Sequence, residues 1–560
     1  METMHPVFYV LLALILILCV IHYYIENSRI VRMGQKIPGP ATVPFFGNAL
    51  LSLRVNPRDI LYKALEYDVY GNVARAFLGP KLVVFLTDPR DVEIILSSHV
   101  HIDKSPEYRF FEPWLGEGLL ISTGDKWRSH RKIIAPTFHL NILKSFVPLF
   151  YENSRQLVRK LHKEVGKEFD CHKYLAAVTV DILLETAMGL KSNDSELKAS
   201  GSDYADAVMK MCDIIHRRQY DLTLRIDALF KFTNFAKQQK KLLNIIHGLT
   251  SRVIDKRKEE YLEGNETTEV EDEKRVQEKV VDKDVTNEKG EKHRKAQSMP
   301  YIRDDLDEID ESEDNDVGEK KRLAFLELLL ELKRNGAKLT DQEIKEEVDT
   351  IMFEGHDTTA AGSSFVLCIL GIYQDIQEKV FQEINEIFKD TDRQCTYQDT
   401  LEMKYLERVI METLRLFPPV PAIARELNED VKLVSADYVL PKGCTVVIPQ
   451  YKIHRSKDYY NNPETFDPDN FLPEKIQQRH YYAYIPFSAG PRSCVGRKYA
   501  MLKLKVVLST VLREYKILSD ITEKDFRLQV DIILKRADGF RIKIERRTAH
   551  RNNDEPISVY

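Results

Sequence analysis

The residue best placed to do chemistry is Cys494, a single cysteine in the glycine-rich run Pro-Phe-Ser-Ala-Gly-Pro-Arg-Ser-Cys-Val-Gly at 486–496. An amphipathic helical pattern follows this run, and a helix N-terminus lowers the pKa of a nearby thiol. Gly490 and Gly496 let the backbone approach a flat macrocycle, and Arg492 suits a carboxylate. A lone cysteine before a helix is usually an inert core residue. The surrounding loop favours a thiolate that binds haem iron.

A second polar cluster, Glu-Gly-His-Asp-Thr-Thr at 354–359, lies inside an apolar helical pattern that starts with the capping box Thr340 to Glu343. Buried polar groups need partners or a purpose. For an isolated Asp-Thr pair, the simplest account is that Thr358 bonds the preceding turn while Asp357 faces solvent.

Both patterns match the cytochrome P-450 superfamily. The run at 486–496 resembles its haem-binding loop Phe-x-x-Gly-x-Arg-x-Cys-x-Gly, and 355–359 resembles its oxygen-activation helix. The resemblance implies that Cys494 is the axial ligand of haem b (iron protoporphyrin IX), with Phe487 in the same loop. It also implies that Thr358 steadies the bound oxygen and an ordered water, that Asp357 relays protons from solvent, and that Gly355 leaves a notch above the iron.

Further motifs follow from the same resemblance. Trp127 and Arg131 match the Trp-x-x-x-Arg helix, and Arg425 matches another propionate ligand. The resemblance implies that these residues, with Arg492, hold the cofactor. The pair Glu412 and Arg415, which by itself would usually be a surface ion pair, resembles the Glu-x-x-Arg helix behind the haem. Many relatives place arginine where this chain has Asn470, so how that network is completed stays open.

Within the superfamily, Glu354 and residues 113–116 and 483–490 resemble family 4, whose members often ester-link this glutamate to haem. Glu354 is therefore either an ester partner or an acid near the haem. The long charged insert and residues 479–482 are similar to insect subfamily G, associated with oxidative decarbonylation of fatty aldehydes to cuticular hydrocarbons. Terminal hydroxylation of fatty acids and oxidation of xenobiotics are the alternatives.

The implied fold is mainly α with a small β region, the triangular cytochrome P-450 prism. The implied partners are NADPH-cytochrome reductase and cytochrome b5. A basic face of Arg497, Lys498, Lys503 and Lys505 could receive the reductase, although a solvated helix face explains the same charges. Rivals from other classes are a haem-binding carrier or sensor and an anchored interaction protein that uses the acidic insert.

The rest of the chain must position these residues. The 560 residues carry a net charge of −5, which gives no general attraction to nucleic acid, and seven cysteines without paired spacing argue against a disulfide framework. Residues 6–24 are almost wholly apolar, and the basic residues Arg29, Arg32 and Lys36 follow them. This pattern indicates a membrane anchor, and a cleaved secretory signal is the alternative. We expect a single-pass anchor in the endoplasmic reticulum membrane with the catalytic domain in the cytosol.

The expected organisation is an anchor at 1–28, a basic and proline-rich hinge at 29–49, a haem-thiolate domain at 50–545 and a tail at 546–560. A charged insert at 259–321 has too few apolar side chains to fold alone, so we expect it to be disordered. Residues 82–86 and 445–448 predict strands. Asp538-Gly539 between 532–534 and 540–542 predicts a hairpin.

Overall fold

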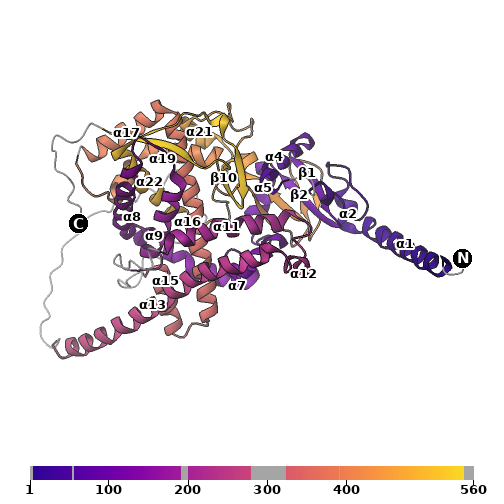
Figure 1. Cartoon of the computed structure of the whole chain (residues 1–560), viewed down its shortest axis with the longest axis horizontal. Coiled ribbons are helices and arrows are strands. Elements are labelled where there is room, and N and C mark those ends of the chain that lie inside the picture. Colours follow the sequence, from indigo (N-terminus) through magenta and orange to yellow (C-terminus); the bar gives the residue numbers. More distant parts are fainter. Residues whose placement is uncertain (1–3, 53–55, 191–199, 279–322, 390, 548–560) are drawn as a thin grey trace.

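The computed structural model describes residues 4–52, 56–190, 200–278, 323–389 and 391–547. Helices dominate the chain, as the sequence predicts; the sheet that contains β1 (Val73–Leu78) and β2 (Lys81–Leu86) lies to one side of them, whereas β10 (Ile533–Arg536) lies against the helical body (Figure 1). The helices are α1 (Met4–Glu26), α2 (Arg29–Gly34), α3 (Ala49–Ser52), α4 (Ile60–Leu65), α5 (Pro89–Leu96), α6 (Glu112–Leu115), α7 (Gly124–Ile134), α8 (Leu140–Leu161), α9 (Cys171–Thr186), α11 (Gly201–Tyr220), α12 (Asp227–Phe230), α13 (Asn234–Glu278), α15 (Phe325–Arg334), α16 (Asp341–Ile372), α17 (Gln374–Phe388), α18 (Tyr397–Glu402), α19 (Lys404–Leu416), α20 (Gln450–Ile453), α21 (Pro473–Gln478) and α22 (Arg497–Glu514).

Helix α16 runs through the middle of the helical body, where it packs against α9, α19 and α22. It begins with the predicted capping box: Thr340 Oγ1 accepts from the Glu343 amide, and the Glu343 carboxylate accepts from the Thr340 amide. Apolar side chains cover most of its circumference from Ile344 onward, which is the pattern of a helix buried on all sides. The polar cluster predicted at 354–359 therefore lies in the core.

Within the described residues, the strands form four small sheets. The largest has the order β1 (Val73–Leu78), β2 (Lys81–Leu86), β7 (Thr445–Ile448), β4 (Ile423–Glu426). A second has the order β3 (Glu168–Asp170), β11 (Arg541–Arg546), β8 (Tyr515–Leu518). The pairs β9 (Leu528–Asp531) with β10 (Ile533–Arg536), and β5 (Val431–Lys432) with β6 (Val439–Leu440), complete the set. The strands predicted at 82–86 and 445–448 are confirmed.

The hairpin predicted around Asp538-Gly539 is wrong. Strand β10 pairs with β9, whereas β11 joins a different sheet with β3 and β8. The tight turn of this region lies earlier, at Ile532, which has a positive φ of 67° between β9 and β10. A local turn signal cannot show which sheet the strands beside it will join.

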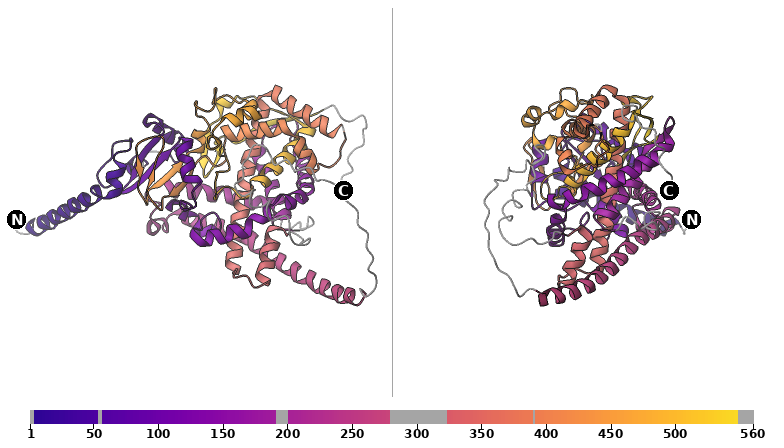
Figure 2. Two further views of the ribbon diagram at one scale, coloured as in Figure 1. Left: turned by 180° about the vertical axis from the view of Figure 1, so that it is seen from behind. Right: turned by 90° about the vertical axis from the view of Figure 1, so that its left-hand side faces the viewer.

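The N-terminal helix α1 extends away from the body (Figure 2). Its segment Val7–Glu26 has a mean hydropathy of 2.5 and is not buried by the rest of the protein, so α1 is long and apolar enough to cross a membrane. The stretch after α2 is bonded to strand β1, because the Arg75 guanidinium donates to the carbonyls of Ile37 (3.1 Å) and Pro40 (3.0 Å).

The disorder predicted for the charged insert is wrong for its first part, 259–278. Helix α13 continues from Asn234 to Glu278, so the backbone of the first part of residues 259–321 is helical. The remainder of the insert, 279–321, lies outside the described residues, as do residues 548–560 of the predicted tail.

Candidate functional site

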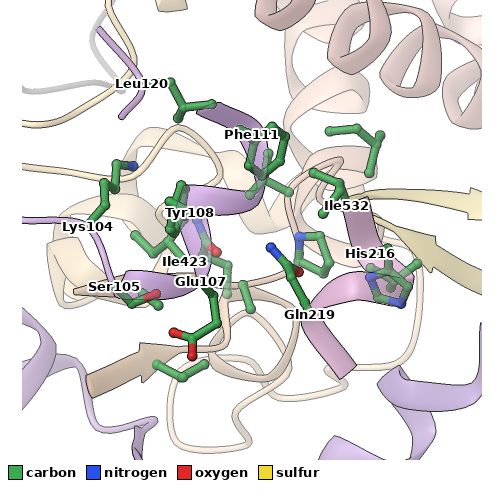
Figure 3. A pocket seen from close by; sticks show the side chains of 18 of the residues that line it. Lys104, Ser105, Glu107, Tyr108, Phe111, Leu120, His216, Gln219, Ile423 and Ile532 are labelled. Atoms are coloured by element: carbon green, nitrogen blue, oxygen red, sulfur yellow. The ribbon is translucent and has the colours of Figure 1, made fainter. Parts of the chain in front are cut away.

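A cavity of about 1270 Å³ lies between α16, the loop before α22 and the sheet that contains β1. Its wall is mainly apolar, and Figure 3 shows part of it, with Phe111, Ile423 and Ile532 around the space. Seven residues singled out from the sequence line this cavity: Trp127, Arg131, Glu354, Thr358, Phe487, Arg492 and Cys494. Residues hundreds of positions apart in the chain therefore meet around one space.

The loop before α22 presents Cys494 to the cavity. The Cys494 amide donates to the Phe487 carbonyl over 2.9 Å, which closes the loop on itself. Gly490 has a φ of +70°, and a Cβ there would lie 1.9 Å from the Leu96 carbonyl oxygen. Gly490 is thus required by contact with the end of α5, and the prediction that it makes room for a macrocycle is wrong. Gly496, which lines the cavity, has open space, since the nearest atom to an added Cβ is 4.0 Å away on Phe138.

The pKa of the Cys494 thiol is not lowered in the protein alone. Burial raises this pKa to about 11, and the negative charge of Glu354 acts in the same direction, against a hydrogen bond from the Gly496 amide and the cations Arg131 and Arg497. The low pKa expected from the helix N-terminus is therefore wrong, because the helix begins three residues later, at Arg497, and desolvation outweighs it. A bound cation reverses this balance, since metal coordination deprotonates a thiol outright.

Three cations gather at one side of Cys494. The Arg492 guanidinium donates to the carbonyls of Ile102 (2.7 Å), Leu119 (3.1 Å) and Leu120 (3.0 Å) and stacks 5.0 Å above the Trp127 ring. Arg425 is only 1% exposed and lies behind the cavity wall. Its backbone forms an isolated antiparallel β-bridge with Lys104.

Lys104 lines the cavity, although no sequence motif marks it as a site residue. A single lysine after Asp103 in a loop carries no spacing signal, and only the fold places it beside the two arginines.

This cluster carries more positive charge than its protein neighbours balance. Burial lowers the pKa of Arg492 to about 9, and repulsion by Arg425 contributes. Burial and the repulsion of both arginines also lower the pKa of Lys104 well below its ordinary value, with Glu354 opposing. Such a group of desolvated cations beside an apolar cavity and a thiol fits a flat apolar ligand that carries carboxylates and a metal ion. The residues therefore fit haem.

On α16, Thr358 lines the cavity, and its Oγ1 donates to the Glu354 carbonyl over 2.6 Å. This bond to the preceding turn is the one predicted for an isolated Asp-Thr pair. Burial raises the pKa of Glu354, and Lys104 opposes this rise. A Cβ on Gly355 would lie 2.9 Å from Leu183 of α9. Leu183 thus lies next to this glycine, and both residues line the cavity.

Asp357 does not face solvent, and the prediction that it does is wrong. Its side chain is fully buried on the side of α16 away from the cavity, where Oδ1 lies 3.1 Å from Lys535 Nζ of β10. Burial is the largest influence and acts to raise the pKa of Asp357, but the charges of Lys535, His356 and His172 and the hydrogen bond from Lys535 together outweigh it, so the pKa is lowered. Lys535 was also missed from the sequence, because a lysine in a short C-terminal strand gives no sign of a buried partner.

The pair Glu412 and Arg415 is completely buried rather than exposed. Arg415 donates through Nε (2.7 Å) and Nη2 (2.8 Å) to the two carboxylate oxygens, and its remaining donors reach the carbonyls of His454, Pro463 and Thr465. Asn470 Nδ2 donates to Glu412 over 3.1 Å. An amide thus takes the third position in the network.

The basic face predicted after Cys494 is partly wrong. Lys503 and Lys505 are buried within α22: Lys503 Nζ donates to the Gly355 carbonyl over 2.7 Å, and Lys505 Nζ lies 2.8 Å from Glu407. Both lysines are buried because the protein covers α22 on all sides, so that every residue from Met501 to Leu512 is buried. Lys498 is partly exposed.

Comparisons with known proteins agree along nearly the whole chain. The family model described as Cytochrome P450 matches residues 37–544. The chain is 53% identical to Cytochrome P450 4g15 of Drosophila melanogaster, with 97% of each chain covered. It is 50% identical to Cytochrome P450 4g1 of the same species, over 97% of this chain and 94% of the relative. Human Cytochrome P450 4V2 is 38% identical, over 95% and 94%.

Proposed function

Because the chain belongs to the cytochrome P450 family, as a monooxygenase of family 4 and subfamily G, we propose that it oxidatively decarbonylates long-chain fatty aldehydes to hydrocarbons. Membership of the family implies a haem cofactor, electrons from a reductase and an organic substrate. The specific reaction, the endoplasmic reticulum as its location, and cytochrome b5 as an additional electron donor are part of the proposal.

The haem, when bound, supplies the iron at which dioxygen is activated. Cys494 would hold the iron through its sulfur, because it is the cysteine that lines the cavity among the described residues. Arg131, Arg492 and Lys104, which line the cavity, would hold the carboxylates, and the charge of Arg425, buried behind the wall, would add to their attraction. Trp127 would pack at the same edge, where it already lies beneath the Arg492 guanidinium.

Glu354 lies within the cavity wall and is the residue that would form an ester with the macrocycle. Its raised pKa favours the neutral carboxyl, while Lys104 favours the carboxylate. If no ester forms, Glu354 remains a buried acid that can hold a proton beside the cavity. Mass spectrometry of denatured protein distinguishes these outcomes, because only an ester link keeps the cofactor on the chain.

Thr358 is the member of the predicted pair whose hydroxyl lines the cavity. Its donor is engaged with the Glu354 carbonyl, so its oxygen lone pairs are free to accept from a water molecule in the cavity. Asp357, the residue before Thr358 on α16, supplies a carboxylate, but its proton exchange must pass through the pair with Lys535. The two residues therefore differ in role: Thr358 contacts the reaction space, and Asp357 acts from behind α16.

The observation that supports a long aliphatic substrate is the composition of the cavity wall. Apolar side chains from α9, α16, β7 and β9 to β10 surround the space and suit a long aliphatic chain. Such a wall suits a fatty acid equally well, so terminal hydroxylation of fatty acids is the second candidate and oxidation of xenobiotics the third.

The deciding experiment is product analysis of the full-length enzyme with reductase, NADPH and membrane lipid. Octadecanal and octadecanoate are supplied separately. A hydrocarbon one carbon shorter than the aldehyde supports the proposal, and a product hydroxylated at the far end of the acid, without hydrocarbon, replaces it with the second candidate. Cys494→Ala is the control for products that do not depend on the haem thiolate.

A further inference from the structure

The carboxylate of Glu347 joins two segments that carry cofactor-site residues, although Glu347 does not itself line the cavity. Glu347 lies on α16 and is 1% exposed. Its Oε1 lies 2.6 Å from Nδ1 of His130 on α7, and its Oε2 accepts from the Leu119 amide over 3.1 Å. One buried carboxylate thus ties both α7 and the loop at 116–123, which joins α6 to α7, to helix α16.

The loop at 116–123 carries acceptors of the Arg492 guanidinium. Arg492 donates to the carbonyls of Leu119 (3.1 Å) and Leu120 (3.0 Å), so the position of this loop determines the position of the guanidinium. Leu119 is held from two sides, through its amide by Glu347 and through its carbonyl by Arg492. Figure 3 shows the Leu120 side chain of the same loop at the cavity.

The loop packs closely on the N-terminal part of α16. A Cβ on Gly118 would collide with Thr350 Oγ1 and would lie 2.7 Å from the Glu346 carbonyl oxygen, both on α16. This fit prevents the loop from moving closer to α16, and the bond from the Leu119 amide to Glu347 prevents it from moving away.

The other oxygen of Glu347 holds α7. His130 is 7% exposed and lies between Trp127 and Arg131 in the sequence, both of which line the cavity. The hydrogen bond to Glu347 raises the pKa of His130, against the effect of burial. Arg492 stacks 5.0 Å above the Trp127 ring, so the contacts of Glu347 through α7 and through the loop lead to the same guanidinium.

We propose that Glu347 is a positioning residue for the cofactor, which acts through Leu119 and His130 to hold Arg492 and α7 where they neutralise the haem carboxylates. The inference rests on the haem of the family and not on the choice of substrate, so the product analysis above can fail without affecting it. A guanidinium that is loosely held neutralises a carboxylate less well, because its paired hydrogen bonds need a fixed geometry. The negative charge left unbalanced then favours ferric over ferrous haem.

The test is the midpoint reduction potential of the purified, full-length, haem-containing protein without substrate. This readout does not depend on release of the haem, so an ester at Glu354 does not affect it. Glu347→Ala removes both contacts. We expect the ratio of ferrous to ferric haem at a fixed potential to fall at least about threefold, which is about 28 mV at about 59 mV per tenfold change for one electron.

The direction of the shift separates position from charge. Deleting a negative charge without moving any neighbour would favour the reduced haem and raise the potential. A rise in the potential of Glu347→Ala, or no change, overturns the inference.

Glu347→Gln is the conservative variant. Its amide oxygen can accept from the Leu119 amide and its NH₂ group can donate to neutral His130, so its potential should stay close to that of wild type. A fall as large as that of Glu347→Ala would assign the effect to the lost charge rather than to position, and would overturn the inference.

Glu383→Ala is the matched control for a general loss of stability. The Glu383 carboxylate also accepts from two backbone amides, those of Tyr405 (2.6 Å) and Leu406 (2.9 Å) at the start of α19, and it does not line the cavity. This variant should keep the wild-type potential even where its unfolding midpoint falls. A shift in Glu383→Ala equal to that of Glu347→Ala would show general loosening of the protein and overturn the inference.

Glu347→Asp covers the case in which Glu347→Ala fails to fold or to take up haem. It keeps the negative charge, but its side chain is one methylene shorter and cannot reach both His130 and the Leu119 amide at hydrogen-bond distance. Its potential should therefore also lie below that of wild type. A wild-type potential in Glu347→Asp overturns the inference.

Discussion

Replacing Arg415 by methionine should remove most of the stability of the haem-binding body. Arg415 and Glu412 have side chains with no exposed surface, so truncating the arginine leaves a buried carboxylate that lacks its cation. Breaking such a pair costs about 3–5 kcal/mol. The three backbone carbonyls that lose a donor add about 1 kcal/mol each. The sum of about 6–8 kcal/mol is comparable to the whole free energy of unfolding of a typical domain, about 5–15 kcal/mol.

The assay is the unfolding midpoint of the purified protein together with the fraction that retains haem. Arg408→Met is the matched control on the same helix, because its partner Asp469 is 56% exposed and such pairs contribute about 0–1 kcal/mol. Glu412→Gln/Arg415→Met should recover part of the loss, since no charge is left buried. If Arg415→Met melts within a few degrees of Arg408→Met and keeps its haem, the reasoning about the buried pair is refuted.

Three further outcomes are expected. Lys535→Met should lower the free energy of unfolding by about 3–5 kcal/mol, because Asp357 is left with a buried charge. Adding Asp357→Asn should recover much of this loss in a double-mutant cycle. Additive losses would contradict the pairing. The hydrogen bond of His130 to Glu347 (2.6 Å) raises the pKa of His130 above its ordinary 6.5, so its stabilisation is complete below about pH 6.5 and is lost as the pH rises through the folded pKa. The unfolding midpoint of His130→Gln should decline less over that range than that of wild type, and parallel curves would reject the assignment. Gly490→Ala should abolish haem incorporation, read from the absorption spectrum, because its Cβ would lie 1.9 Å from the last carbonyl of α5; normal incorporation would show that the loop can shift.

The sequence was sufficient to predict features whose geometry depends only on residues close together in the chain. The capping box of α16, the strands at 82–86 and 445–448, and the one-face spacing of Glu412 and Arg415 are local features, and the structure has them as predicted. Local patterns do not specify a partner far along the chain. The turn at Asp538-Gly539 therefore suggested the wrong strand pairing.

The candidate site shows the same limit. Cys494, Arg492 and Thr358 were found because they belong to compact motifs, and all line the cavity. Lys104 and Lys535 were missed because each is a single lysine in an unremarkable segment. Their importance comes from burial beside charges contributed by other elements, and burial of this kind is a property of the folded chain.

The same cause explains the wrong placement of two groups. Asp357 was expected at the surface and Lys503 on a basic face, since charged side chains are seldom fully buried without a partner. Each has one: Lys535 for Asp357, and the Gly355 carbonyl for Lys503. Long-range partners of this type override the average preference of a residue for solvent.

The central claim is that Cys494 provides the sulfur ligand of the haem iron. The most direct measurement is the absorption spectrum of the purified, reduced protein under carbon monoxide. The account predicts the red-shifted Soret band of a thiolate-bound haem for wild type and its absence from Cys494→Ala. A wild-type spectrum without that band, or a Cys494→Ala protein that retains it, would contradict the account.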